Sequence, residues 1–172
     1  PKRCYLYKKQ APLESIDGMC AKITACKQHS PADFVVIARI EALVQGLGME
    51  EALCRARHYV DAGADAILIH SVANNQQEVL DFAQRYHASS ATKPLVCVPT
   101  TYPDVTKAQL HDAGFSLAIY ANYSVRATVQ AMRSLLPELH KANALADMQA
   151  QCGPVKDVIA LMDQDKMQQL ET

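Results

Sequence analysis

The sequence predicts an α/β fold of four consecutive βα units with parallel strands, which we interpret as half of an (α/β)8 barrel. Short apolar runs rich in β-branched residues alternate with segments of helical periodicity. The predicted strands start about 20 to 31 residues apart, the spacing of strands joined by crossover helices. An open doubly wound sheet is the alternative, and it is disfavoured because no glycine-rich phosphate loop follows the first strand.

The first half of the chain supplies two of these units. Apolar residues at helical spacing predict a helix over residues 12–28. A continuous β-branched run at 34–38 is typical of a strand buried on both faces. Residues 49–62 return to the helical period, and Gly63 is placed to cap that helix. Residues 65–69 then form the second predicted strand.

The second half of the chain repeats the pattern. We expect, in order, helix 75–87, strand 95–98, helix 104–113, strand 115–120 and helix 124–135. Pro137 ends or kinks the last of these helices, because proline removes a backbone donor and clashes with the preceding turn. A final helix is predicted over residues 154–171, with Pro154 in its first turn. All 172 residues are expected to form one domain.

Composition and charge exclude several classes of function. Hydrophobic residues make up 49% of the chain and charged residues 20%, as in ordinary globular proteins. The net charge of −1 gives no reason to expect a nucleic-acid or membrane-surface partner. The 6 cysteines lack CxxC spacing, which argues against a zinc site or a thioredoxin-type motif. Reduced cysteines without a signal peptide or a long apolar span favour a cytoplasmic location.

Polar side chains follow all four predicted strands. In parallel βα folds, chemistry gathers at the carboxyl ends of the strands. An arginine there offers a fork of donors that suits carboxylate or phosphoryl oxygens. The sequence therefore predicts a site for a small anionic ligand at the barrel mouth, lined by Arg39, Glu41, His70, Ser71, Thr100 and Asn122.

Each member of this set also has a simpler interpretation. Arg39 and Glu41 are two residues apart on one face of an extended segment and could pair only with each other. His70 alone could be a hydrogen-bonded structural histidine. Asn122 could cap the following helix. The ligand site is favoured because the residues occur together at one predicted edge.

Four strand-end segments, in consistent order, resemble a known family. They are residues 36–43 (VIARIEAL), 63–71 (GADAILIHS), 98–103 (VPTTYP) and 119–122 (IYAN). These segments resemble the phosphoenolpyruvate mutase and phosphonopyruvate hydrolase family of the isocitrate lyase superfamily. The resemblance implies the C-terminal half of a TIM-type (α/β)8 barrel.

The family's chemistry gives the expected function. The resemblance implies an enzyme that interconverts phosphoenolpyruvate and phosphonopyruvate, forming the carbon–phosphorus bond of phosphonate biosynthesis. A phosphonopyruvate hydrolase, releasing pyruvate and phosphate, is one alternative, and a non-catalytic half-barrel remnant is another. Arg39 and His70 are implied to be catalytic and to contact the substrate. Around them, the resemblance implies substrate contacts from Ser71 and Asn122 and support from behind by Glu41 and Thr100.

The two ends of the chain carry further implications of the resemblance. Residues 1–11 match the family's gating loop, where Lys2 and Cys4 would bind substrate, although Cys4 stands where the family has Asn or Thr. The family's Mg²⁺ ligands belong to the first four barrel strands, so we expect none in this chain and no activity from this chain alone. A homo-oligomer, dimer or tetramer, that exchanges the helix at 154–171 is also implied.

Overall fold

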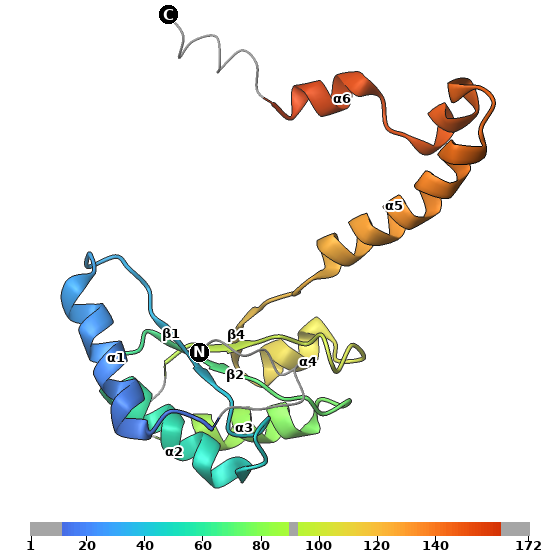
Figure 1. The fold of residues 1–172 in the computed structure, drawn as a ribbon. Coiled ribbons are helices and arrows are strands. Elements are labelled where there is room, and N and C mark those ends of the chain that lie inside the picture. Colours follow the sequence, from blue (N-terminus) through green and yellow to red (C-terminus); the bar gives the residue numbers. More distant parts are fainter. Residues whose placement is uncertain (1–11, 90–92, 163–172) are drawn as a thin grey trace, which may run out of the picture. The chain divides into compact units, whose positions relative to one another are not determined.

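Four parallel strands with helices between them form the first part of the computed structural model, which describes residues 12–89 and 93–162 (Figure 1). Internal packing divides the chain into two units, with the boundary between Ala121 and Asn122. The first unit contains the sheet and is the one that positions the predicted site. The second unit contains the remaining helices.

The sheet has strand order β1-β2-β3-β4, and each strand pairs in parallel with the next one along the chain. The strands are β1 (Ile37–Ile40), β2 (Ala66–Ile69), β3 (Leu95–Cys97) and β4 (Phe115–Ala118). A doubly wound sheet reverses its strand order at a switch point, whereas a barrel adds each strand to the same edge. The observed order is the one expected of a barrel segment.

Helices precede or connect these strands: α1 (Ile16–His29), α2 (Gly48–Asp61), α3 (Gln77–His87) and α4 (Lys107–Asp112). Ser15 caps α1 by accepting a hydrogen bond from the backbone N–H of Gly18. Thr106 and Gln109 form a reciprocal capping box at the start of α4. The helix at α2 ends where Gly63 adopts a φ of +102°, as its place in the sequence predicted.

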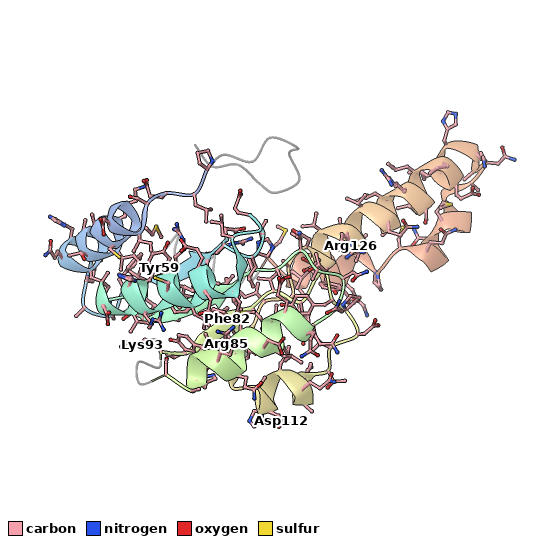
Figure 2. The ribbon with its side chains drawn as sticks, turned by 90° about the horizontal axis from the view of Figure 1, so that it is seen from below. Tyr59, Phe82, Arg85, Lys93, Asp112 and Arg126 are labelled. Atoms are coloured by element: carbon pink, nitrogen blue, oxygen red, sulfur yellow. The ribbon has the colours of Figure 1, made fainter. Side chains whose placement is uncertain are left out.

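One face of the sheet packs against these helices and forms the main core. From the strands, Ala38, Ile40, Ile67, Ile69 and Leu95 belong to this core. Tyr59 on α2 and Phe82 on α3 cover them (Figure 2). Because side chains alternate along a strand, the intervening residues point to the opposite face.

That opposite face carries a smaller apolar cluster without helical residues, made of Ala66, Leu68 and Val96 with Val98 against them. In register beside it, Ile37 pairs with Ala66 and is 40% exposed. This face corresponds to the interior of a barrel.

The structure moves some boundaries. The strand predicted at 34–38 is observed at Ile37–Ile40, because its pairing with Ala66–Ile69 begins at Ile37. Arg39 therefore lies inside β1 rather than after it. The helix α5 (Tyr123–Lys141) continues through Pro137, so of the two predicted effects, ending or kinking the helix, the first is wrong.

The second unit contains α5, a short 3-10 helix (Leu145–Gln151) and α6 (Val155–Ala160). Pro154 is the N-cap of α6, one residue before its first turn. None of the residues of α5 is buried, and its large apolar side chains recur at spacings of three and four: Val125, Val129, Met132, Leu136 and Leu139. Within the described ranges, no helix combines the length and apolarity that crossing a bilayer requires.

Candidate functional site at the carboxyl edge of the sheet

Arg39 and His70 come together because of the register between β1 and β2. Arg39 pairs with Leu68, and side chains two residues apart on a strand share a face. Glu41 follows Arg39 at that interval, and His70 follows Leu68 at the same interval. The three polar side chains therefore stand on the same face as the smaller apolar cluster, at the carboxyl edge of the sheet.

The three side chains contact one another directly. The Nε atom of Arg39 donates a hydrogen bond to Oε1 of Glu41. Nδ1 of His70 lies 2.9 Å from Oε2 of Glu41 and 2.7 Å from Nη2 of Arg39. The sequence left open whether Arg39 and Glu41 pair only with each other, and the structure adds His70 to that pair.

Burial differs sharply within this cluster. The His70 side chain is 6% exposed, whereas that of Arg39 is 45% exposed and that of Glu41 is 30% exposed. Partial burial disfavours the charged form of Glu41, but hydrogen bonding and charge from His70, together with Arg39, outweigh it and lower the pKa of the carboxyl group. Glu41 is thus a carboxylate at neutral pH, and the Arg39 side chain beside it stays nearly half exposed.

Ser71 lies beside His70 but is fully enclosed. Its hydroxyl donates to Oε2 of Glu78 and accepts from the backbone N–H of Ala73 at 3.0 Å. The Thr101 hydroxyl donates to the Ser71 carbonyl at 3.1 Å. These contacts fix the loop that follows β2. The sequence analysis did not identify Glu78 or Thr101 as residues of the site. Glu78 could have been found, because it lies in the first turn of α3, from which its side chain can contact the end of β2.

The end of β3 contributes buried hydroxyl groups. Oγ1 of Thr100 and Oη of Tyr102 are buried without a hydrogen-bond partner among the described residues. Tyr102 is 1% exposed, and its hydroxyl lies beside the Cys97 thiol, which is only a weak partner. Burial, with Cys97 adding to it, raises the pKa of Tyr102. The supporting role of Thr100 stays a prediction. Tyr102 was missed because a tyrosine between two prolines is typical of a loop.

Asn122 begins the second unit and has a left-handed backbone, with φ +68°. Asparagine tolerates this conformation better than most residues. Its side chain makes no capping hydrogen bond to α5, so the capping interpretation fails. Next to it, the Arg126 guanidinium lies 5.5 Å from the ring centre of Tyr123, a cation–π contact. Lys2 and Cys4, also predicted to bind substrate, lie outside the described residues.

The residues of this edge do not fit a magnesium ion. Mg²⁺ prefers an octahedral set of oxygen ligands. Across residues 12–89 and 93–162, no three His, Cys, Asp or Glu side chains are grouped so that they could hold a metal. Glu41 is already engaged by Arg39 and His70. The edge is suited to binding an anion through Arg39, not to binding a cation.

Two surface hollows lie elsewhere on the first unit. One, of about 560 Å³, is lined by α3, by the last residue of α4 and by the turn that follows it, with His87 and Asp112 among the lining residues. The other, of about 220 Å³, is lined by α4 and β4. Neither includes Arg39, Glu41 or His70. The chemistry-bearing cluster and the described hollows are therefore separate features of the surface.

Comparison with known proteins gives one consistent result. The family model for phosphoenolpyruvate phosphomutase matches residues 5–140. The phosphonopyruvate hydrolase of Variovorax sp. (strain Pal2) is 38% identical over 160 residues, covering 92% of this chain and 53% of the relative. The crystal structure of phosphoenolpyruvate phosphomutase from Streptomyces platensis subsp. rosaceus matches with a TM-score of 0.90 and 38% identity, covering 99% of this chain and 59% of that one.

A third match carries ligands. A crystal structure of phosphonopyruvate hydrolase in complex with oxalate and Mg²⁺ is 37% identical and has a TM-score of 0.85, covering 92% of this chain and 56% of that chain. The chain thus spans little more than half the length of the proteins it matches. The four parallel βα units correspond to about half of the TIM-type barrel in those structures.

Proposed function

Because the chain belongs to the phosphoenolpyruvate phosphomutase family, we propose that it supplies half of the active site of an enzyme that interconverts phosphoenolpyruvate and phosphonopyruvate. The cluster of Arg39, Glu41 and His70 is the observation that carries the proposal. It sets a half-exposed guanidinium beside a buried imidazole at the carboxyl edge of parallel strands. Catalytic groups of parallel barrels are found at this edge.

The chemistry of the cluster suits the proposed substrates. Both are small anions that carry a carboxylate and a phosphoryl or phosphonyl group. Transfer of a phosphoryl group proceeds through a loose transition state whose charge is spread over its oxygens, so catalysis depends on positioning and on fixed positive charge. Arg39 would supply that charge. His70 would contact the same ligand, and Asn122, Lys2 and Cys4 are proposed as further substrate contacts.

Ser71 and Thr100 are proposed to support the site and not to contact the substrate in the arrangement seen here. The Ser71 hydroxyl is engaged by Glu78 and Ala73, so its role is to hold the backbone next to His70. Thr100 supports the strand edge from behind, as the resemblance implied. Ser71 reaches the substrate only if that hydroxyl is released from Glu78.

Phosphonopyruvate hydrolysis is the second candidate, and its case rests on the gate residue Cys4, because sequence identity does not separate the two reactions. The hydrolase from Variovorax and the mutase from Streptomyces platensis share the same 38% identity with this chain. Cys4 stands at a predicted gate position where neither the family's Asn nor its Thr is present. Water that enters an incompletely closed gate would divert transfer into hydrolysis.

The proposed enzyme needs Mg²⁺, but the described residues do not supply its ligands. A related hydrolase binds Mg²⁺ together with oxalate. Here the cluster at the strand edge does not fit that ion, so we propose that its ligands come from sequence that this chain does not include. A half-barrel without them would be non-catalytic, and for that reason we expect no turnover from the 172-residue chain alone.

Phosphorus NMR distinguishes the two reactions. The natural protein that carries this sequence is mixed with phosphonopyruvate and Mg²⁺, and the phosphorus signals are followed with time. A growing phosphoenolpyruvate signal supports the mutase, and inorganic phosphate formed together with pyruvate supports the hydrolase. If phosphonopyruvate is consumed in neither way, both proposals are contradicted and a binding or structural role is favoured.

A further inference from the structure

Nδ1 of His70 lies within hydrogen-bond distance of both a donor and an acceptor. Nη2 of Arg39, a donor, is 2.7 Å away, and Oε2 of Glu41, an acceptor, is 2.9 Å away. An imidazole nitrogen carries either a proton or a lone pair. Only one of the two contacts can therefore be a hydrogen bond at any moment. The choice determines which tautomer of His70 the site contains.

The surroundings favour a proton on Nδ1. If Nδ1 carried a lone pair, the Glu41 carboxylate would face it at 2.9 Å, and among the described residues Oε2 has no other hydrogen-bond partner. His70 is nearly fully buried, so water cannot easily replace a lost partner there. Arg39 is half exposed, so its guanidinium, which moves as one planar group, can shift away from Nδ1 and donate from Nη to water or to a ligand. The cost of losing a contact is thus lowest for Arg39.

We propose that Glu41 is a positioning residue that holds His70 as the Nδ1–H tautomer through Oε2 and holds Nε of Arg39 through Oε1. The proposed tautomer rests on the two contacts of Nδ1, and its consequence for catalysis rests on the proposed function. One carboxylate then aligns both substrate-contacting side chains. Nη of Arg39 becomes the donor edge for an anion, and Nε2 of His70 becomes the ring nitrogen that can accept a proton. Carboxylates that orient histidines in this way recur in enzyme sites.

The tautomer can be measured without substrate. The natural protein is labelled with ¹⁵N in its histidine rings, and the His70 signals are assigned by their loss in His70→Gln. At a pH where the ring is neutral, we expect the shift of a protonated nitrogen at Nδ1 and of an unprotonated nitrogen at Nε2. A wild-type ring protonated mainly at Nε2 would overturn the proposal, whatever the protein's activity.

Two variants sharpen the test. Glu41→Gln keeps the side-chain shape but offers an amide, so we expect the Nε2–H form of His70 to become the major tautomer. Glu50→Gln is the matched control, because Glu50 pairs with Arg85 between α2 and α3 and does not contact the cluster. It should leave the His70 spectrum unchanged. An unchanged tautomer in a folded Glu41→Gln protein would also contradict the proposal.

Activity gives a separate readout. Loss of a carboxylate that orients a metal-bound histidine typically costs about 10- to 100-fold in affinity or activity, and we take the same range for a carboxylate that orients a substrate-contacting histidine. We expect Glu41→Gln to lower kcat/KM for phosphonopyruvate by about that factor and Glu50→Gln to leave it unchanged. A wild-type protein inactive on phosphonopyruvate but with the Nδ1–H tautomer would contradict the proposed function alone. An active protein with the Nε2–H tautomer would contradict the positioning role alone.

Discussion

Cys97 illustrates how burial decides the chemistry of a single side chain in this fold. It ends β3, is fully enclosed and lies beside the Tyr102 hydroxyl. Burial raises the pKa of its thiol to about 11, and the Tyr102 contact only partly opposes that rise. The thiolate is the reactive form of cysteine, so this thiol is unreactive at neutral pH for two reasons, its pKa and its inaccessibility.

We therefore expect Cys97 to resist alkylation in the native protein. With N-ethylmaleimide at neutral pH, the exposed Cys26 and Cys152 should be modified first, and Cys97 only after unfolding in denaturant. Mass spectrometry of digested samples, taken over time with and without denaturant, measures each site separately. Labelling of native Cys97 as fast as Cys26 would show that the end of β3 opens to solvent.

The residues of the site differed in how far they could be predicted. Arg39 and His70 could be placed at one edge from sequence, because strand ends of parallel units meet there. The hydrogen-bond partners of the hydroxyl groups near the site could not be predicted. Nothing in the residue types shows that the Ser71 hydroxyl is taken by Glu78 while Thr101 donates to the Ser71 backbone. Such contacts depend on loop conformation, which local pattern does not determine.

At the scale of elements, the turns between helices and strands carry specific backbone requirements. Gly114 connects α4 to β4 with φ +85°. A Cβ atom built there would lie 2.5 Å from Nε2 of His87, which itself contacts the Gly114 carbonyl at 3.2 Å. Gly46 has a similar φ of +68°, but nothing lies within 4 Å of a Cβ atom at that position. A side chain at Gly46 would cause backbone strain alone, whereas a side chain at Gly114 would cause both backbone strain and steric overlap.

This difference predicts unequal costs for two alanine substitutions. Gly46→Ala should lower the free energy of unfolding by about 1–2 kcal/mol through left-handed strain alone. Gly114→Ala should cost about 0.5–1.5 kcal/mol more, because the His87 ring must move and gives up its contact with the Gly114 carbonyl. Urea unfolding of the natural protein measures both. In a His87→Ala background the excess should vanish, and an excess that persists there would show that the overlap with His87 is not its cause.

Local sequence pattern predicted the boundaries of strands and helices less well than their types. The apolar run at 34–38 predicted a strand, but pairing with β2 sets the observed strand at Ile37–Ile40. Proline lowers helix stability inside a helix, yet α5 continues past Pro137 to Lys141. Element types along the chain could be predicted from periodicity, whereas the 3-10 helix at Leu145–Gln151 could not, because its sequence has no distinct period.

At the scale of the whole molecule, α5 presents an apolar stripe whose large side chains are 40–62% exposed. Its large apolar side chains, from Val125 to Leu139, follow one helical stripe. Exposed stripes of this kind mark interaction surfaces. The sequence predicted a homo-oligomer that exchanges the helix at 154–171, and α6 covers only part of that range among the described residues. The oligomer remains a prediction.

A charge placed on the stripe tests it. Met132→Glu puts a carboxylate on the apolar side of α5, so we expect the natural protein to shift toward smaller species in analytical ultracentrifugation, because burying an unpaired charge is costly. Gln130→Glu, on the same helix but outside the stripe, should leave the sedimentation profile unchanged. Equal profiles for wild type and Met132→Glu would mean that the stripe is not an interface between copies.

The central claim is that the edge formed by Arg39, Glu41 and His70 binds the anionic substrate of a mutase-type enzyme. The most direct measurement is phosphonopyruvate turnover by phosphorus NMR for wild type, Arg39→Ala, Arg39→Lys and Arg85→Ala. Arg85 is the matched control, because its side chain is also 45% exposed and paired with a glutamate. Loss of one donor to a developing anion typically costs about 2.7–4 kcal/mol, or roughly 10² to 10³ in rate.

We predict a loss of that size for Arg39→Ala, a smaller loss for Arg39→Lys, which keeps the charge but not the planar fork, and wild-type turnover for Arg85→Ala. Near wild-type turnover by a folded Arg39→Ala protein would contradict the claim and leave Arg39 as a structural partner of Glu41 and His70.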